Sequence, residues 1–365
     1  MADVLVLHPA LAPYRVQFFN WLARISDCHV LFMGRQVPNQ AFSRDVTFDR
    51  LRVEYSFVER IISLVGREFP IGVSNHVRKH APKIIIATEF SPVTLMLCGL
   101  KQRYGFRLLT IVDESPGQVR SASFVKRLVR WFALKAMDGL VVLSEEARMA
   151  FRAAGYKGEI AVLPLVQDEV ELRTHIKSAT VVAEKWLDTY QLRECQVVLY
   201  VGRLAPEKNL GFLLESFAHL KRNRSEARLI MVGEGPERQS LVAAANRLGI
   251  GDAVIMPGRL EGDELYGWYL AADVFVLPSS REPYGAVVNE ALVFGLPVVC
   301  SRHAGAAALI EGKRQGMVLP IDDPAAFAKG VDDLLEEGRS DESRMPFSFG
   351  DAQKEFNDLV WGLLQ

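Results

Sequence analysis

The chain has 365 residues, 49% of them hydrophobic, and this length is typical of two domains of ordinary size rather than of a single core. The formal net charge of −1 gives no indication of a nucleic-acid partner. The four cysteines are scattered and form no CxxC pair, which favours a reduced, cytoplasmic setting and predicts no metal site. No uncharged apolar run approaches the roughly 18 residues that a membrane helix needs, and the start of the chain resembles a first strand rather than a signal peptide.

The two halves of the chain differ in charge. Residues 1–167 carry 22 Lys and Arg against 14 Asp and Glu, whereas the remainder carries 21 against 30. A positive excess in one half indicates contact with an anionic partner. Ordinary variation in surface charge explains the same difference equally well.

Short apolar runs alternate with helix-length segments along the chain, which predicts an α/β protein with doubly wound parallel sheets. In the first half the predicted strands are residues 4–8, 29–33, 83–88, 107–112, 139–144 and 160–164. The predicted helices there include residues 14–26, 92–104, 121–137 and 145–154.

The second half repeats the alternation after a polar stretch, residues 168–195, that we interpret as a linker carrying one helix. Its predicted strands are residues 197–202, 228–233, 253–258, 274–279 and 297–301. Its predicted helices are residues 207–222, 236–248, 262–271, 286–294 and 324–337. We therefore expect a first domain at 1–167, a second at 196–345, and a C-terminal amphipathic helix at 346–365 that packs back on the first domain. Two such domains facing each other across a cleft would bind a ligand there, beyond the carboxyl ends of their strands.

The stretch REPYGAVVNEALVFGLPVV, residues 281–299, combines two acids with a glycine at a helix start. The amides that follow Gly285, including those of Ala286 and Val287, lack intrahelical acceptors. Free amides at a helix N-terminus favour a phosphate group. Glu282 and Glu290 accept hydrogen bonds when ionised, so hydroxyl-rich groups at either end of a diphosphate would explain both acids.

A second motif, GRLAPEKNLGFLLESF, follows the strand predicted at 197–202. Gly202 permits a tight exit from the strand, and Arg203 and Lys208 place two cations at its carboxyl end. Such cations would bind a diphosphate and offset the charge that builds on a leaving phosphate. Taken alone, the stretch is as easily a solvated loop with ordinary salt bridges.

Together with VGEGPE at 232–237 and MPGRL at 256–260, these motifs resemble family 4 glycosyltransferases of the GT-B fold. That family shows a G-R-x-x-x-E-K stretch and an E-x7-E motif, and the resemblance extends over about residues 196–310 in the same order. The resemblance implies two Rossmann-like domains and a metal-free reaction that retains the anomeric configuration, with a UDP-, GDP- or ADP-sugar as donor. It also implies a role for each matching position: Arg203 and Lys208 on the diphosphate, Glu282 on the sugar, Glu290 on the ribose, Gly202, Gly233, Gly285, Ala286 and Val287 around the phosphates, and Arg259 and Leu260 near the base.

The first half departs from the family pattern. The glycine-rich loop expected after the first strand is replaced by HPALAPYR, in which Tyr14 and Arg15 open a helix and are candidates for contact with the acceptor or a phosphate. A capped surface turn is the plain alternative. Where relatives carry a histidine after the strand at 107–112, this chain has Asp113 and Glu114, which would orient an acceptor hydroxyl or act as a base.

The segment at 120–137 is basic and contains no acid. Val125, Leu128, Val129 and Phe132 have helical spacing, so we expect them to face the core. The remaining basic face, flanked by Phe124 and Trp131, suits either plain solvation or an anionic membrane surface.

The sequence therefore predicts a retaining glycosyltransferase that moves a sugar from a nucleotide diphosphate to an acceptor hydroxyl. By family frequency, the expected setting is cell-envelope polysaccharide, lipopolysaccharide or exopolysaccharide assembly, with a saccharide or lipid-linked saccharide acceptor, in the cytoplasm or peripherally on the inner face of the membrane. A sugar-nucleotide epimerase of the same layout and a non-catalytic sugar-nucleotide-binding scaffold are the alternatives.

Overall fold

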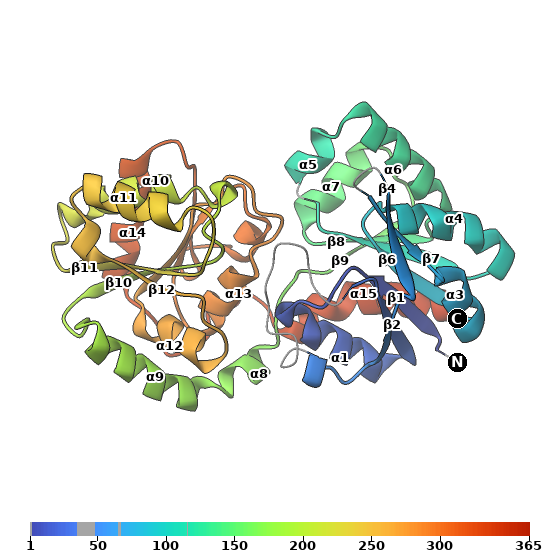
Figure 1. The fold of residues 1–365 in the computed structure, drawn as a ribbon, viewed down its shortest axis with the longest axis horizontal. Helices are drawn as coiled ribbons and strands as arrows, with labels where there is room; N and C mark the ends of the chain where they lie inside the picture. Colours follow the sequence, from blue (N-terminus) through green and yellow to red (C-terminus); the bar gives the residue numbers. More distant parts are fainter. Residues whose placement is uncertain (1, 35–47, 65–66, 115) are drawn as a thin grey trace. The chain divides into compact units, whose positions relative to one another are not determined.

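The computed structural model describes residues 2–34, 48–64, 67–114 and 116–365 (Figure 1). The chain divides into two compact units, which are described separately. Unit 1 comprises residues up to Val166 together with Gly350–Gln365, and unit 2 comprises Gln167–Phe349. Within the described residues, no helix combines the length and the hydropathy needed to cross a bilayer.

Unit 1 contains a seven-stranded parallel sheet in the order β3-β2-β1-β6-β7-β8-β9. Its strands are β1 (Val4–His8), β2 (Cys28–Phe32), β3 (Glu54–Phe57), β6 (Ile84–Thr88), β7 (Arg107–Val112), β8 (Gly139–Val142) and β9 (Glu159–Val162). A separate hairpin is formed by β4 (Arg60–Leu64) and β5 (Arg67–Ile71). The helices are η1 (Pro13–Arg15), α1 (Val16–Ile25), α3 (Val73–His80), α4 (Pro92–Tyr104), α5 (Pro116–Arg120), α6 (Phe124–Ala136), α7 (Glu145–Ala153) and α15 (Phe349–Leu364).

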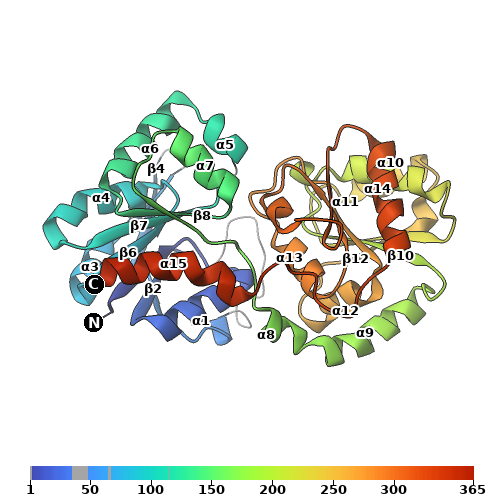
Figure 2. The same cartoon turned by 180° about the vertical axis from the view of Figure 1, so that it is seen from behind.

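Both faces of this sheet are buried, because the central strands β1 and β6 are apolar at every position except their last residues, His8 and Thr88. In β1, Val4 and Val6 face a core that includes α1, whereas Leu5 and Leu7 face another core on the opposite side. The C-terminal helix α15 completes the first of these cores (Figure 2). Its fully buried Phe356 lies with its ring centroid 5.6 Å from that of Phe18 on α1, so the end of the chain is part of unit 1.

Unit 2 contains a six-stranded parallel sheet in the order β12-β11-β10-β13-β14-β15. Its strands are β10 (Gln196–Val201), β11 (Ala227–Val232), β12 (Val254–Gly258), β13 (Val274–Leu277), β14 (Val298–Ser301) and β15 (Gly316–Leu319). Its helices are α8 (Glu169–Arg173), α9 (Ile176–Thr189), η2 (Pro206–Lys208), α10 (Leu210–Lys221), α11 (Arg238–Arg247), η3 (Gly251–Ala253), α12 (Asp263–Ala271), α13 (Ala286–Val293), η4 (Gly305–Leu309) and α14 (Pro324–Glu337). Helices α10 and α14 pack together on one face of the sheet, and α9 and α12 pack together on the other.

The interpretation of residues 168–195 as a linker is wrong. The segment forms α8 and α9, and α9 packs on α12 as part of unit 2. The indole of Trp186 on α9 stacks on that of Trp268, with centroids 5.7 Å apart, and its Nε1 donates to the carbonyl of Glu264. Ala179 and Ala183 precede Trp186 at helical spacing and are buried, so a narrow apolar stripe holds an otherwise polar helix in place.

The orientation predicted for α6 is also wrong. Val125, Leu128, Val129 and Phe132 were expected in the core. Val129 is half-buried, but Val125, Leu128 and Phe132 are 62%, 45% and 58% exposed. The buried residues of this helix are Arg130 and Ala133. An amphipathic pattern shows that a helix has two faces, but it does not show which of them packs on the sheet.

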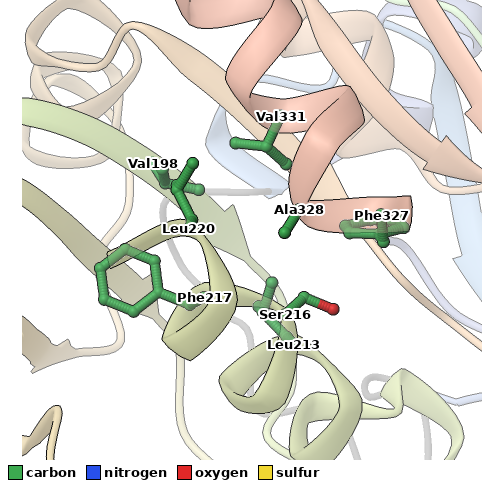
Figure 3. A pocket seen from close by; sticks show the side chains of 8 residues that line it. All are labelled: Val198, Leu213, Ser216, Phe217, Leu220, Phe327, Ala328 and Val331. Atoms are coloured by element: carbon green, nitrogen blue, oxygen red, sulfur yellow. The ribbon is translucent and has the colours of Figure 1, made fainter. Parts of the chain in front are cut away.

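A small space between α10 and α14 is lined by apolar side chains (Figure 3). Its volume is about 10 Å³, which is near the minimum for a single water molecule. The one polar side chain that lines it, Ser216, already donates to the carbonyl of Phe212 at 2.8 Å. The space is therefore a packing defect in the core, without the groups that would recognise a polar ligand.

Candidate functional site

The strand order of unit 2 defines where a ligand is expected. From β10, the chain continues to β11 and β12 on one side, and it then crosses to β13 on the other side of β10. The carboxyl ends of β10 and β13 therefore flank the point at which the strand order reverses, which is the usual binding position in an open doubly wound sheet. Both sequence motifs that predict a diphosphate site follow these two strands, at residues 202–209 and 278–285.

Close backbone contacts hold the loop after β10 in place. The amide of Gly202 donates to the carbonyl of Val232 at 3.0 Å, and the amide of Leu204 donates to the carbonyl of Glu234 at 2.9 Å. A Cβ atom on Gly233 would lie 1.9 Å from the carbonyl oxygen of Gly202. Two loops pack backbone to backbone here, and only glycine fits at Gly233, which has a φ of +149°.

The two cations of the first motif lie in ion pairs. Arg203 pairs with Glu207 four residues further on and is 44% exposed, whereas Lys208 pairs with the carboxylate of Glu282 from the loop after β13. The side chains of Lys208 and Glu282 are only 16% and 11% exposed. The predicted cation and the predicted sugar-binding acid therefore meet across the switch point, 74 positions apart in the sequence.

Backbone hydrogen bonds join the same two loops. The carbonyl of Glu207 accepts from the amide of Ser280 at 2.9 Å and from its hydroxyl at 3.1 Å. Glu282 is held on its other side by a bridge to Ala304, in which its carbonyl accepts from the amide of Gly305 at 3.2 Å. These bonds orient Glu282 so that its carboxylate reaches Lys208 and accepts from the hydroxyl of Ser279 at 3.4 Å.

Helix α13 begins beside this pair. Gly285, which precedes it, has a φ of +97°, and a Cβ there would lie 2.9 Å from a methyl carbon of Leu277, so glycine is required. The amides of Ala286 and Val287 donate to no described residue, whereas the amide of Val288, also expected to be free, donates to the carbonyl of Gly285 at 3.0 Å. Two backbone donors are thus available for an anion at this helix end.

Glu290 lies further along α13 in a different environment. Its two carboxyl oxygens accept from Nε2 of Gln167 at 2.6 Å and from the hydroxyl of Tyr269 at 2.8 Å. Burial raises the pKa of Glu290, and the hydrogen bonds from Tyr269 and Gln167 partly oppose this rise. Gln167 and Tyr269 were missed by the sequence analysis, because their partner is 123 and 21 positions away and neither belongs to a motif.

The residues predicted near the base follow β12 at the same edge of the sheet. Arg259 and Leu260 come directly after Gly258, whose carbonyl accepts from the amide of Gly233 at 2.8 Å. Arg259 forms an ion pair with Glu261 and is partly exposed. Asp168, at the start of unit 2, caps α8 by accepting from the amide of Val170 at 3.0 Å.

In unit 1 the strand order reverses between β1 and β6. The predicted acceptor-side residues follow the carboxyl ends of β1 and of β7, the strand next to β6. Tyr14 and Arg15 are in η1, and Nη2 of the buried Arg15 donates to both carboxyl oxygens of Asp113 at 2.9 Å. Glu114 forms ion pairs with Arg130 and Lys126. Both acids are therefore neutralised by neighbouring cations.

Glu89, at the end of β6, was missed. It is the first residue after the strand, it has a φ of +58°, and the hydroxyls of Thr94 and Thr110 hold its carbonyl at 2.7 and 3.1 Å. Burial, and secondarily the charge of Asp113, raises the pKa of Glu89 to about 8. Its carboxylate accepts from the amide of Asp113 at 2.8 Å and forms no ion pair with a described residue. The sequence feature that could have identified Glu89 is its position as an acid directly after a buried strand.

Among the described residues, no three His, Cys, Asp or Glu side chains are grouped so that they could hold a metal ion. Unit 2 instead offers two cations, two amides without a described acceptor and the acid Glu282 at one sheet edge, with Glu290 further along α13. Cations and free amides are groups that can bind a diphosphate, and ionised carboxylates can accept hydrogen bonds from hydroxyls.

Comparison with known proteins agrees with this reading of unit 2. Residues 188–348 match the family model for glycosyl transferases group 1. D-inositol 3-phosphate glycosyltransferase 2 of Catenulispora acidiphila is 35% identical over 152 residues, which are 39% of this chain and 36% of that protein. The GDP-mannose-dependent alpha-(1-6)-phosphatidylinositol monomannoside mannosyltransferase of Mycolicibacterium smegmatis is 31% identical over 159 residues, 42% of each protein. The chain thus spans about a third of the length of the first curated relatives it matches.

Similar solved structures cover the whole chain. The structure of Anabaena Alr3699/HepE in complex with UDP and glucose has a TM-score of 0.73 at 18% identity, over 100% of this chain and 99% of that one. The structure of the lipopolysaccharide outer core galactosyltransferase WaaB has a TM-score of 0.67 at 15% identity, over 98% of this chain and 99% of that one.

These likenesses confirm the predicted fold class, a GT-B architecture built from two doubly wound parallel-sheet units. The predicted relationship agrees with the family match: residues 188–348 match the model for glycosyl transferases group 1, and the curated relatives that resemble this chain are themselves glycosyltransferases.

Proposed function

We propose that the protein is a retaining glycosyltransferase that moves a sugar from a nucleotide diphosphate sugar to an acceptor hydroxyl. The observation that carries this proposal is the Lys208–Glu282 pair at the switch point of unit 2, beside Arg203 and the free amides that begin α13. These residues lie within the segment that matches the family model. Several relatives and neighbours are named for sugar transfer or contain UDP, which supports a nucleotide sugar as the donor.

Each side chain has a defined task in the proposed reaction. Arg203, Lys208 and the amides of Ala286 and Val287 bind the diphosphate, and Glu282 accepts hydrogen bonds from the sugar hydroxyls. The acceptor oxygen bonds to the anomeric carbon on the face from which the diphosphate leaves, and the acceptor proton passes to the departing diphosphate oxygen. Arg203 and Lys208 stabilise the charge that grows on that oxygen. Glu290, with Tyr269, holds the ribose.

The acceptor is proposed to be a saccharide or lipid-linked saccharide of the cell envelope, assembled on the cytoplasmic side. Support comes from the names of similar proteins, which include a galactosyltransferase of the lipopolysaccharide outer core and an alpha-monoglucosyldiacylglycerol synthase of Streptococcus pneumoniae. In unit 1, Glu89 and Arg15 are the proposed acceptor contacts, because they lie at the carboxyl edge of that sheet.

The direct test is a panel of UDP-, GDP- and ADP-sugars incubated with the full chain, with and without EDTA. We expect one donor to release its nucleoside diphosphate slowly by hydrolysis, at the same rate in EDTA, and to transfer its sugar with retained configuration by proton NMR once an acceptor is supplied. A donor sugar that changes configuration without release of nucleotide would favour an epimerase. Tight binding without any reaction would favour a scaffold.

A further inference from the structure

Helix α6 presents an apolar face to solvent. Five large apolar side chains are exposed: Phe124 79%, Val125 62%, Leu128 45%, Trp131 50% and Phe132 58%. At 100° per residue they fall within a sector of about 120° on the helix surface. Exposure of five such residues on one element is far more than the scattered apolar residues that ordinary surfaces carry.

The opposite side of α6 fixes this orientation. Arg130 is 3% exposed, donates to the carboxylate of Glu114 at 2.5 Å and lies 5.7 Å and 5.3 Å from the ring centroids of Phe90 and Phe151. Turning the apolar face inward would expose these rings and leave Glu114 without its buried partner. The outward apolar face therefore follows from the packing of Arg130.

Exposed cations accompany the apolar face. Residues 116–137 contain no Asp or Glu, and they include Arg120, Lys126, Arg127 and Lys135. Nζ of Lys135 lies 3.5 Å from the ring centroid of Trp131, within the apolar sector. Arg120 and Arg127 are exposed and form no ion pair with any residue that the structure describes. Lys126 is paired with Glu114, but Lys135 lies within the apolar face and Arg127 lies beside it. An apolar face that carries such cations is complementary to an anionic phospholipid surface.

We propose that α6 docks on the surface of a bilayer that contains anionic phospholipid, with Phe124, Leu128 and Trp131 inserted at the boundary between headgroups and acyl chains. A symmetric dimer through α6 fits the charges less well, because an isologous contact would bring Arg127 and Lys135 of one copy close to the same cations of the other. The proposal does not depend on the sugar-transfer chemistry, and its failure would leave the proposed function untouched.

The test is co-sedimentation of the full chain with vesicles of phosphatidylcholine alone and of phosphatidylcholine with phosphatidylglycerol at 7:3. We expect binding to the mixed vesicles, at least ~10-fold weaker binding to phosphatidylcholine alone, and loss of binding as salt rises. The variant Phe124→Ser with Trp131→Ser should bind at least ~10-fold less, as should Arg127→Glu with Lys135→Glu. Trp361→Ser is the matched control, since Trp361 is an equally exposed indole on α15.

Folding is checked by circular dichroism and the oligomeric state by light scattering. Equal binding to both vesicle types, or binding that the α6 variants do not reduce, would overturn the proposal. A wild-type dimer that becomes a monomer in the Phe124→Ser, Trp131→Ser variant would assign the face to a second copy of the chain instead.

Discussion

Substitution of Lys208 and Glu282 tests whether this pair is only a structural salt bridge or also binds the donor. The variants are Lys208→Met, Glu282→Gln and the two combined, which keep side-chain volume and remove charge. Both side chains are more than four-fifths buried, and among the residues that the structure describes the other side-chain partner of the Glu282 carboxylate is the hydroxyl of Ser279 at 3.4 Å. Loss of one partner therefore leaves a poorly compensated charge.

The expected effect on stability follows from this burial. Breaking a fully buried pair costs about 3–5 kcal/mol, and the partial exposure of this pair lowers the expected cost to about 1–3 kcal/mol for each single variant. The combined variant leaves no unpaired charge, so its loss should be smaller than the sum of the two single losses by about 1–2 kcal/mol. Urea unfolding of the three variants measures these differences.

Turnover should behave differently. Each single variant is expected to lose at least roughly 100-fold in release of nucleoside diphosphate from the donor, because transition-state electrostatics are removed. The combined variant should regain stability without regaining turnover. If turnover returned together with stability in the combined variant, the pair would be a structural salt bridge and the assignment of these residues to the donor would be refuted.

Three further predictions concern single positions. Glu290→Gln should weaken nucleotide binding, measured by calorimetry. Because burial raises the pKa of Glu290, the nucleotide affinity of the wild type should fall as pH is lowered, whereas that of the variant should not change with pH. Parallel pH profiles of the two proteins would contradict a role of Glu290 in binding. Gly233→Ala should lower the free energy of unfolding by about 2–4 kcal/mol, because its Cβ would overlap the carbonyl of Gly202; an unchanged urea midpoint would contradict the packing of the two loops. For Glu89, the folded pKa of about 8 lies above the ordinary 4.5, so the folded state holds the proton more tightly and stability falls as pH rises from about 4.5 to about 8. Glu89→Gln should remove this loss, so that melting temperatures at pH 5.5 and 8.5 differ less than in wild type; equal differences would show that the carboxyl is not perturbed.

The sequence predicted the strands well where burial is complete. The run VLVLH at 4–8 coincides with β1, and the helix predicted at 92–104 coincides with α4. The hairpin at β4 and β5 and the edge strand β3 were missed, because edge and hairpin strands carry mixed and partly exposed residues, including a proline at Pro70. Continuous apolar runs are a property of strands covered on both faces.

Motif residues close in sequence were easier to predict than their distant partners. The glycines at 202, 233 and 285 stand where the backbone approaches a neighbour too closely for a Cβ atom. The local motifs indicated Gly202 and Gly285, and the family resemblance implied Gly233. The bonds from Gln167 and Tyr269 to Glu290 depend on how α12 and the start of unit 2 pack against α13, which no local pattern encodes. The outward face of α6 depends in the same way on the buried Arg130–Glu114 pair.

Calorimetric titration of UDP, GDP and ADP into the full chain tests most directly whether the switch point of unit 2 binds a nucleotide diphosphate. We predict that one nucleotide binds, that Arg203→Ala weakens it at least ~10-fold, and that Arg222→Ala, an exposed arginine at the end of α10, leaves it unchanged. Absence of binding by all three nucleotides, or equal affinity in Arg203→Ala and wild type, would contradict the assignment of this site.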